Sequence, residues 1–321
     1  MRKFVAVIAA GALTLAGVFF WMHEEPLTAP APAHVATPFP FPTPPPPASQ
    51  APTAGSNPYS GLTARLANPL ENAPSLRVYF ERYQNSTDAL ERWFAARAWT
   101  ACFPLFLPPT NGAATIEQAT RALSVGAPDY AERVEAYRML MGRCKGFLDL
   151  PRATLVAQSA QISGAIQADT LQSPGAHAHT LVQHGQPTQA AQLARTILSA
   201  DDGYALDSLR DYVFDILSAR AERADLNSGL APSPPAMRPD LRALTLSVTA
   251  CDLRLACGPA SLSALQRCAN SGQCSGDLRQ RLLQDLTPAE QRSVLQASAE
   301  LRAALRSHDF TAVDWLAADG R

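Results

Sequence analysis

Residues 250–278 carry the strongest structural signal in the chain: ACDLRLACGPASLSALQRCANSGQCSGDL. Four cysteines lie here as two C-x5-C pairs that are separated by ten residues. Each pair spans the junction between two expected helices, and helices joined by a short connection pack antiparallel. The adjoining helix ends therefore come close in space, which favours the pairs Cys251–Cys257 and Cys268–Cys274.

Two further cysteines, Cys102 and Cys144, lie on segments with the pattern of amphipathic helices. Six cysteines in an exported chain are typical of three disulfides, so these two are expected to pair with each other. Their loop, of about 40 residues, is the longest of the three, and chain entropy gives that bond on the order of 3–4 kcal/mol. A four-cysteine zinc site is a poor alternative, because structural zinc prefers two to four residues between paired ligands. No C-x-x-C occurs in the chain, which disfavours a redox-active pair.

Helical signals run through the chain from Tyr59 onward, whereas alternating strand patterns are nearly absent. Ala and Leu are abundant, Thr115 and Thr287 begin capping boxes, and proline stands at the expected first turn of several helices. One long amphipathic helix is expected over residues 202–224 and a last short one over 310–317. The prediction is an all-α domain of about a dozen helices in an antiparallel array, and an irregular αα-solenoid is one form of such an array.

Residues 4–22, FVAVIAAGALTLAGVFFWM, form an uncharged apolar run that is long enough to cross a bilayer as a helix. Arg2 and Lys3 precede this run, and two glutamates follow it. The positive-inside rule therefore keeps the N-terminus in the cytoplasm and sends the rest of the chain across the membrane. The inner membrane is the expected partner of this segment.

Proline, alanine and threonine dominate residues 26–58, a composition that favours an extended polyproline spacer. The expected organisation is a membrane anchor or signal segment at 1–25, a disordered linker at 26–58 and a helical, disulfide-stapled domain at 59–321. A proline-rich stretch near 227–239 is a candidate sub-boundary. Cleavage of the first segment would release a soluble periplasmic or secreted protein, but its long apolar core favours an uncleaved anchor.

The cysteine-rich stretch quoted above resembles the tails of uncharacterised exported helical proteins of Gram-negative bacteria. That resemblance implies export and disulfides, and it implies no activity. In the middle of the chain, Gly164-Ala165-x-x-Ala168 and Gly185-x-x-x-x-Ala190-Ala191 resemble the small-residue packing of Sel1-like and tetratricopeptide repeats. Such repeats stack helical hairpins into a solenoid, and an irregular helical array is the alternative.

The composition and motifs indicate little chemistry. A net charge of −1 lacks the basic excess that nucleic-acid binding needs, so no nucleic-acid partner is expected. His177, His179 and His184 lie close together, but no acidic residue is placed beside them to complete a metal site, so surface or partly buried positions are expected. The chain contains no G-x-S-x-G, H-E-x-x-H, P-loop or G-x-G-x-x-G motif. No catalytic, cofactor-binding or metal-ligating residue is therefore predicted.

Residues 210–222, RDYVFDILSARAE, are similar to the R-x-x-F-D-Y-[FC]-L-S-A-x-G-E motif of lipase-specific foldases. Those proteins also combine a membrane anchor, an Ala/Pro-rich spacer and a helical domain. The stretch departs from the motif by an extra residue after Arg210 and at Ile216 and Ala221, and it lies in mid-domain. The leading expectation is a membrane-tethered periplasmic scaffold that binds a protein or cell-wall partner without catalysis. An envelope-acting enzyme of unknown class and a steric foldase-like chaperone are the alternatives.

Overall fold

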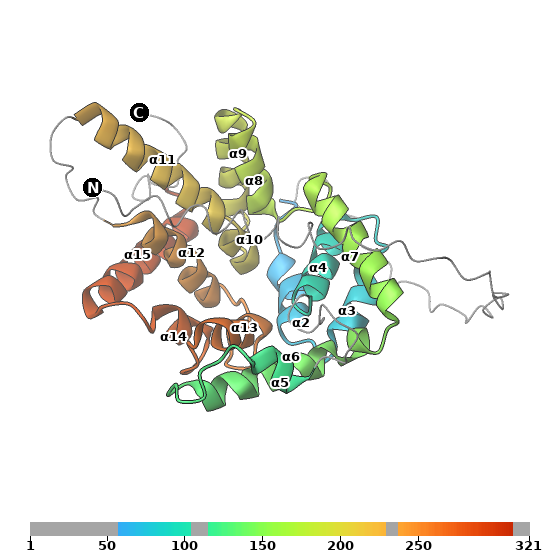
Figure 1. Cartoon of the computed structure of the whole chain (residues 1–321). Coiled ribbons are helices and arrows are strands. Elements are labelled where there is room, and N and C mark those ends of the chain that lie inside the picture. Colours follow the sequence, from blue (N-terminus) through green and yellow to red (C-terminus); the bar gives the residue numbers. More distant parts are fainter. Residues whose placement is uncertain (1–56, 104–114, 229–236, 311–321) are drawn as a thin grey trace. The chain divides into compact units, whose positions relative to one another are not determined.

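The computed structural model describes residues 57–103, 115–228 and 237–310 (Figure 1). All the regular elements in these ranges are helices, so the described part of the chain is all-α, as the sequence predicts. The expected anchor, most of the linker and the expected last helix lie outside the described residues. Within the described ranges, no helix combines the length and apolar character needed to span a bilayer.

The α-helices are labelled in Figure 1. In chain order the elements are a π-helical turn η1 (Thr63–Ala67), α2 (Asn68–Glu71), α3 (Leu76–Tyr83), α4 (Ala89–Thr100), α5 (Ile116–Thr120), α6 (Tyr130–Leu148), α7 (Arg152–Gln167), α8 (Pro174–Gln183), α9 (Pro187–Leu198), α10 (Gly203–Ser208), α11 (Arg210–Ser228), α12 (Pro239–Asp252), α13 (Leu262–Ser271), α14 (Leu278–Leu283) and α15 (Pro288–Ser307).

The single helix predicted over residues 202–224 is wrong, because the chain breaks at Leu209 into α10 and α11. The first turn of α8 packs closely against the backbone at Ser208 and Leu209, where the break occurs. The Gly175 N–H donates a hydrogen bond to Ser208 Oγ at 3.0 Å. A Cβ on Gly175 would lie only 1.7 Å from the Ser208 carbonyl oxygen, so the close approach requires glycine.

Two groups of buried side chains hold the helices together. The larger one takes residues from nearly every element and includes Phe94, Leu140 and Tyr212. The smaller one joins α12, α13, α14 and α15 around Leu241 and Val294. Sequential pairs such as α3–α4 and α8–α9 pack on each other. The pair α6–α13 connects the early and late parts of the domain, and α12–α15 packs within the late part.

All six cysteines are paired, in the three pairs that the spacing predicts. Cys102–Cys144 connects the end of α4 to α6, with 5.6 Å between the Cα atoms. Cys251–Cys257 joins the last turn of α12 to the residues that follow it, and Cys268–Cys274 spans the end of α13. The last two pairs therefore lie on either side of α13.

The three disulfides should contribute unequally to stability. Replacing Cys102 and Cys144 with alanine removes the bond across a 42-residue separation, whereas the Cys268/Cys274 double alanine variant opens one of only 6. Chain entropy predicts a loss of about 4 kcal/mol in the first case and about 2 kcal/mol in the second. Guanidinium unfolding of the two variants measures the difference. An equal or larger loss in the Cys268/Cys274 variant would contradict the entropic explanation.

Candidate functional site

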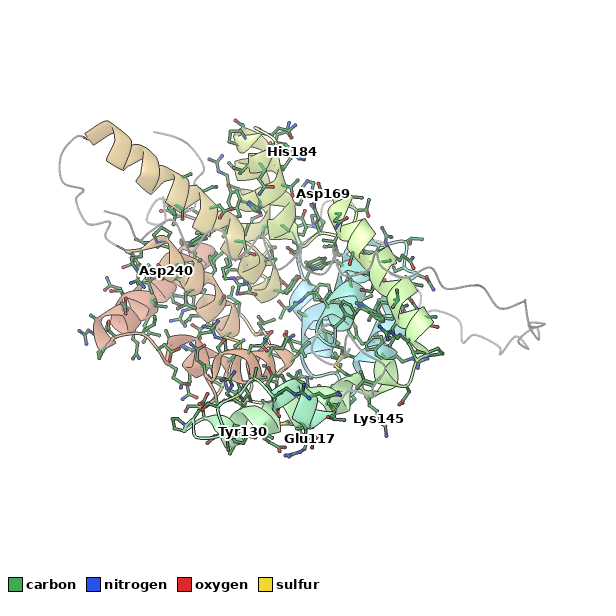
Figure 2. All side chains as sticks on the ribbon, viewed as in Figure 1. Glu117, Tyr130, Lys145, Asp169, His184 and Asp240 are labelled. Atoms are coloured by element: carbon green, nitrogen blue, oxygen red, sulfur yellow. A yellow bond between two sulfur atoms is a disulfide. The ribbon has the colours of Figure 1, made fainter. Side chains whose placement is uncertain are left out.

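The three histidines singled out in the sequence lie on or beside α8, and the structure supplies an acidic partner that the sequence did not indicate. His179 Nε2 lies 2.5 Å from Asp215 Oδ2 of α11, and His177 Nδ1 lies 3.2 Å from Gln172 Oε1. His184 lies at the tip of the α8–α9 hairpin (Figure 2). Among the described residues, no three His, Cys, Asp or Glu side chains are grouped so that they could hold a metal ion.

The stretch that is similar to the foldase motif forms the first part of α11. Tyr212 and Val213 are buried in the core, whereas Phe214 is 43% exposed. Asp215 is engaged by His179. The structure thus gives this stretch a role in attaching α11 to α8, and it leaves one exposed aromatic side chain.

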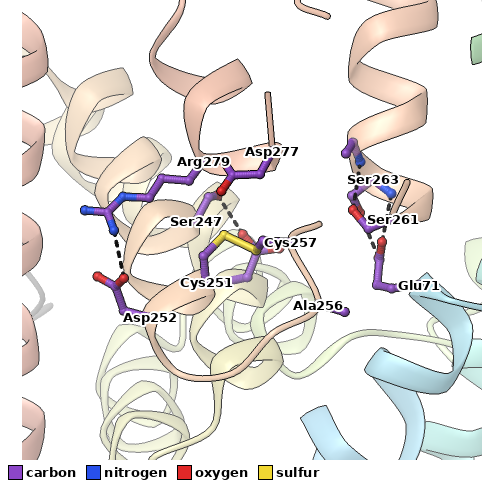
Figure 3. Close-up of a disulfide and its surroundings, with 12 residues drawn as sticks. Glu71, Ser247, Cys251, Asp252, Ala256, Cys257, Ser261, Ser263, Asp277 and Arg279 are labelled. Carbon is purple, nitrogen blue, oxygen red and sulfur yellow. Dashed lines mark hydrogen bonds and ion pairs between the residues drawn. A yellow bond between two sulfur atoms is a disulfide. The ribbon is translucent and has the colours of Figure 1, made fainter. Parts of the chain in front are cut away.

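The carboxylate of Glu71 is the centre of a buried polar cluster. Glu71 is the last residue of the four-residue helix α2, and it is only 3% exposed. Ser263 donates to it twice, from its backbone N–H at 2.8 Å and from its hydroxyl at 2.7 Å (Figure 3). Ser263 lies in the first turn of α13, where the unpaired N–H groups and the helix dipole favour a negative charge. Glu71 therefore caps α13 from 192 residues away.

Two arginines of α6 complete the attachment of α13. Arg133 donates to the carbonyl oxygens of Ala269 and Asn270, at 3.0 and 3.1 Å, in the last turn of α13. A cation is favourable there because the carbonyl end of a helix is partly negative. Arg143 bridges the carbonyl oxygens of Glu71 and Ala260, at 2.9 and 2.5 Å. Glu71 and Arg133 thus hold the two ends of α13 with charges of the sign that its dipole favours, and Arg143 ties the residues just before α13 to the end of α2.

Arg97 of α4 lies beside Glu71 and stacks near Tyr204 of α10. Its Nη2 is 3.8 Å from Glu71 Oε1, and its guanidinium carbon is 5.4 Å from the centre of the Tyr204 ring. Burial lowers the pKa of Arg97, but attraction to Tyr204, Glu71 and Asp207 outweighs burial and leaves the pKa raised. The Tyr204 hydroxyl accepts a hydrogen bond from Trp93 Nε1 at 2.6 Å. The arrangement is a charged, hydrogen-bonded tie between α4, α2 and α10.

A second buried carboxylate, Asp202, joins η1 to α10. Its two oxygens accept hydrogen bonds from the backbone N–H and the hydroxyl of Thr63, each at 2.8 Å. One oxygen also caps α10 by accepting from the Ala205 N–H at 3.0 Å. The Thr63 hydroxyl in turn accepts from the Tyr204 N–H at 2.8 Å. Three of these four contacts have a backbone N–H as the donor, which is the behaviour of a structural carboxylate.

A small apolar hollow lies next to the Cys102–Cys144 disulfide, with about 10 Å³ of open space. Its lining residues are Trp99, Cys102, Phe103, Phe147, Leu148 and Leu155. The space is close to that of one water molecule, so in this conformation the hollow is too small for a ligand. The neighbouring Trp99 Nε1 is buried and has no hydrogen-bond partner, which makes this corner of the core imperfectly satisfied.

Comparisons of the chain with protein-family profiles, curated proteins and solved structures find no match. Glu71, Asp202, Arg133 and Arg143 each use their polar atoms on the backbone of a distant helix end. None of these four residues was singled out in the sequence, where each looks like an ordinary surface charge of a helix.

Removing the Glu71 carboxylate should destabilise the fold strongly. Glu71→Ala leaves the Ser263 donors and Arg97 without their acceptor, and we expect a loss of about 3 kcal/mol in the free energy of unfolding. Glu81→Ala is the matched control, because Glu81 forms an exposed pair with Arg77 within α3 and should cost under about 0.5 kcal/mol. Chemical denaturation measures both. Equal losses in the two variants would show that Glu71 does not tie α2 to α13.

Tyr204 should contribute to alkaline unfolding. Burial raises its pKa, and the charge of Arg97 and the Trp93 hydrogen bond oppose that rise only in part. An unfolded tyrosine ionises near pH 10, so the stability from this site is complete below about pH 10 and is lost as the pH rises toward the folded pKa.

The Tyr204→Phe variant cannot ionise at this position. We expect it to be less stable at pH 8, because Trp93 loses its acceptor, but to lose stability less steeply above about pH 10. The free energy of unfolding measured from pH 8 to pH 11 tests this. Identical slopes for the variant and the wild type would contradict the assignment.

Proposed function

We propose that this protein is a non-catalytic, membrane-tethered helical scaffold whose folded domain lies in the periplasm and binds protein or cell-wall partners. One observation carries the proposal: all six cysteines are joined in three disulfides. Disulfides form and persist in oxidising compartments and are rare in the cytoplasm. Export is also what the charge asymmetry around residues 4–22 predicts.

Tethering is proposed from the N-terminal sequence. The apolar run at 4–22 has the length of a membrane span, and the proline-rich residues that follow suit a spacer that holds a domain away from the bilayer. For the folded domain we propose an antiparallel array of helical hairpins, in the manner of an irregular αα-solenoid. The packing of α3 on α4 and of α8 on α9 supports that arrangement.

The use of the buried charges supports a scaffold more than an enzyme. The carboxylates of Glu71 and Asp202 accept hydrogen bonds from backbone and hydroxyl groups that fix helix ends. A catalytic carboxylate, by contrast, needs a free edge within reach of a substrate. A scaffold needs rigidity, and ties of this kind provide it.

An enzyme acting on an envelope substrate is the second candidate, and Arg97 is the observation in its favour. Its side chain is partly exposed, and Glu71, Asp207 and Tyr204 all act on its charge. In an enzyme, Arg97→Lys would abolish turnover in a chain that stays folded. In a scaffold, the same change would weaken the tie between α2 and α4 and lower the melting temperature.

The tethered scaffold predicts the state of the intact chain in cells. It should remain in the membrane after alkaline carbonate extraction, and a maleimide should label its denatured form at six cysteines only after reduction. Replacing residues 4–22 with a cleavable signal peptide is the matched control, since it should release the domain into the soluble periplasm with its disulfides intact. Six reactive thiols without reduction would contradict the periplasmic location.

Binding is tested in the same cells. Cross-linking of the intact chain in the envelope, followed by purification, should recover a specific protein or a peptidoglycan fragment. That product should persist in the Arg97→Lys variant at a temperature where the variant is folded. Recovery of the chain with no attached envelope component, together with turnover that depends on Arg97, would replace the scaffold with the enzyme.

A further inference from the structure

Only one of the three disulfides, Cys251–Cys257, has no fully buried cysteine. Cys102 and Cys144 are 4% and 0% exposed, within the larger group of buried side chains. Cys268 is 3% exposed and belongs to the same group. Cys251 and Cys257 are both half-buried, beside the smaller group. A thiol that reacts with a disulfide must reach one of its sulfur atoms, so exposure favours reaction at this bond.

The loop that this bond closes also contains strained backbone. Arg254 lies within the loop and has a φ of +69°, in the left-handed region that residues with a side chain rarely adopt. The loop closed by Cys268–Cys274 has a residue at positive φ as well, but that residue is Gly272, which adopts the conformation without strain. Exposed or strained disulfides are the ones that thiols reduce most easily, and Cys251–Cys257 meets both conditions.

The bond lies where the end of α12 meets the start of α14 (Figure 3). Cys251 is in the last turn of α12, and the carbonyl oxygen of Cys257 accepts a hydrogen bond from the Leu278 N–H of α14 at 2.8 Å. Asp252, the next residue of α12, pairs with Arg279 of α14 at 2.9 Å. Breaking the sulfur–sulfur bond therefore frees residue 257, with its hydrogen bond to α14, and leaves the ion pair in place.

Other contacts of the loop do not involve sulfur. Asn68 of α2 donates to the Arg254 carbonyl oxygen at 2.9 Å and accepts from the Ala256 N–H at 2.6 Å. Glu71, three residues further along α2, holds the start of α13 through Ser263. These contacts remain when the disulfide opens, so the two thiols stay near each other and the bond can form again.

We propose that Cys251–Cys257 is a reversible redox switch, which a dithiol opens and an oxidant closes. One thiolate of the dithiol bonds to either sulfur atom, the sulfur–sulfur bond breaks, and the other sulfur leaves with the electron pair and takes a proton. The second thiol of the dithiol then attacks the mixed disulfide, which releases the second cysteine as a thiol. The dithiol becomes a disulfide, and two electrons and two protons have passed to the chain.

A protein with a reactive C-x-x-C dithiol is the class of partner that would operate the switch, because the low thiol pKa in such motifs favours attack on exposed disulfides. The chain has no C-x-x-C of its own, so the dithiol belongs to another molecule. Opening loosens the junction of α12 and α14 and leaves the larger core intact. The proposal does not depend on the scaffold role or on the membrane tether.

Equilibrium reduction of the full oxidised chain, purified in detergent, tests which bond opens first. The chain is held in mixtures of reduced and oxidised dithiothreitol, free thiols are alkylated, and peptide mass spectrometry locates them. Cys251–Cys257 should be half-reduced at a ratio of reduced to oxidised reagent about tenfold lower than either other disulfide, in a chain that keeps its circular dichroism. Oxidised reagent should then restore the same pair. Earlier opening of Cys268–Cys274, or opening of all three bonds together with unfolding, would overturn the proposal.

Position 254 tests the contribution of strain. Arg254→Gly relieves the strained φ and should raise the ratio for half-reduction of Cys251–Cys257 about threefold. Arg254→Val should lower that ratio, because a β-branched residue tolerates this conformation least. His308→Gly is the matched control, since His308 is also exposed with a φ of +54° but lies at the end of α15, and it should leave the ratio unchanged. Equal ratios in both Arg254 variants and the wild type would contradict the proposal.

Hydrogen exchange measures what the open bond does to the fold. In the Cys251→Ala/Cys257→Ala variant, the amides of Leu253 and Leu278 should exchange about tenfold faster than in the wild type, because the junction opens locally. The Cys268→Ala/Cys274→Ala variant removes a bond of the same sequence separation, 6, and should leave the Leu253 amide protected. An unchanged Leu278 amide in the first variant, or a Leu253 amide that exchanges equally fast in both, would overturn the switch.

Discussion

The structure depends first on how α13 is held between the early and late parts of the domain. Glu71 lies at its N-terminus, and Arg133 lies at its C-terminus. Each charge has the sign that the helix dipole favours at that end, so the two contacts reinforce each other. They also satisfy donors and acceptors that a ten-residue helix leaves unpaired. Because Glu71 and Arg133 come from α2 and α6, the position of α13 determines how the cysteine-rich stretch meets the N-terminal helices.

The disulfides act on this arrangement at two different ranges. Cys251–Cys257 and Cys268–Cys274 close short loops on either side of α13, which begins at the Ser261 cap and ends at the left-handed Gly272. They do not bring distant parts together. Cys102–Cys144 does, because it ties the end of α4 to the same helix, α6, that carries Arg133 and Arg143. The disulfide thus helps to position α6, and with it the two arginines that contact α13 and the residues just before it.

The features that depend on residues close together in the sequence could be predicted from it, whereas most contacts between distant residues could not. The helix caps at Thr115 and Thr287 and the two C-x5-C pairs follow from local spacing, and Cys102–Cys144 follows because only these two cysteines remain. The turn η1 and the four-residue helix α2 have no side-chain cap and too few residues to show a period, so they were missed. The break at Leu209 was missed because its cause is Gly175 of another helix. Glu71 looks like any surface carboxylate until the fold brings Ser263 to it, and the same holds for His179 and Asp215.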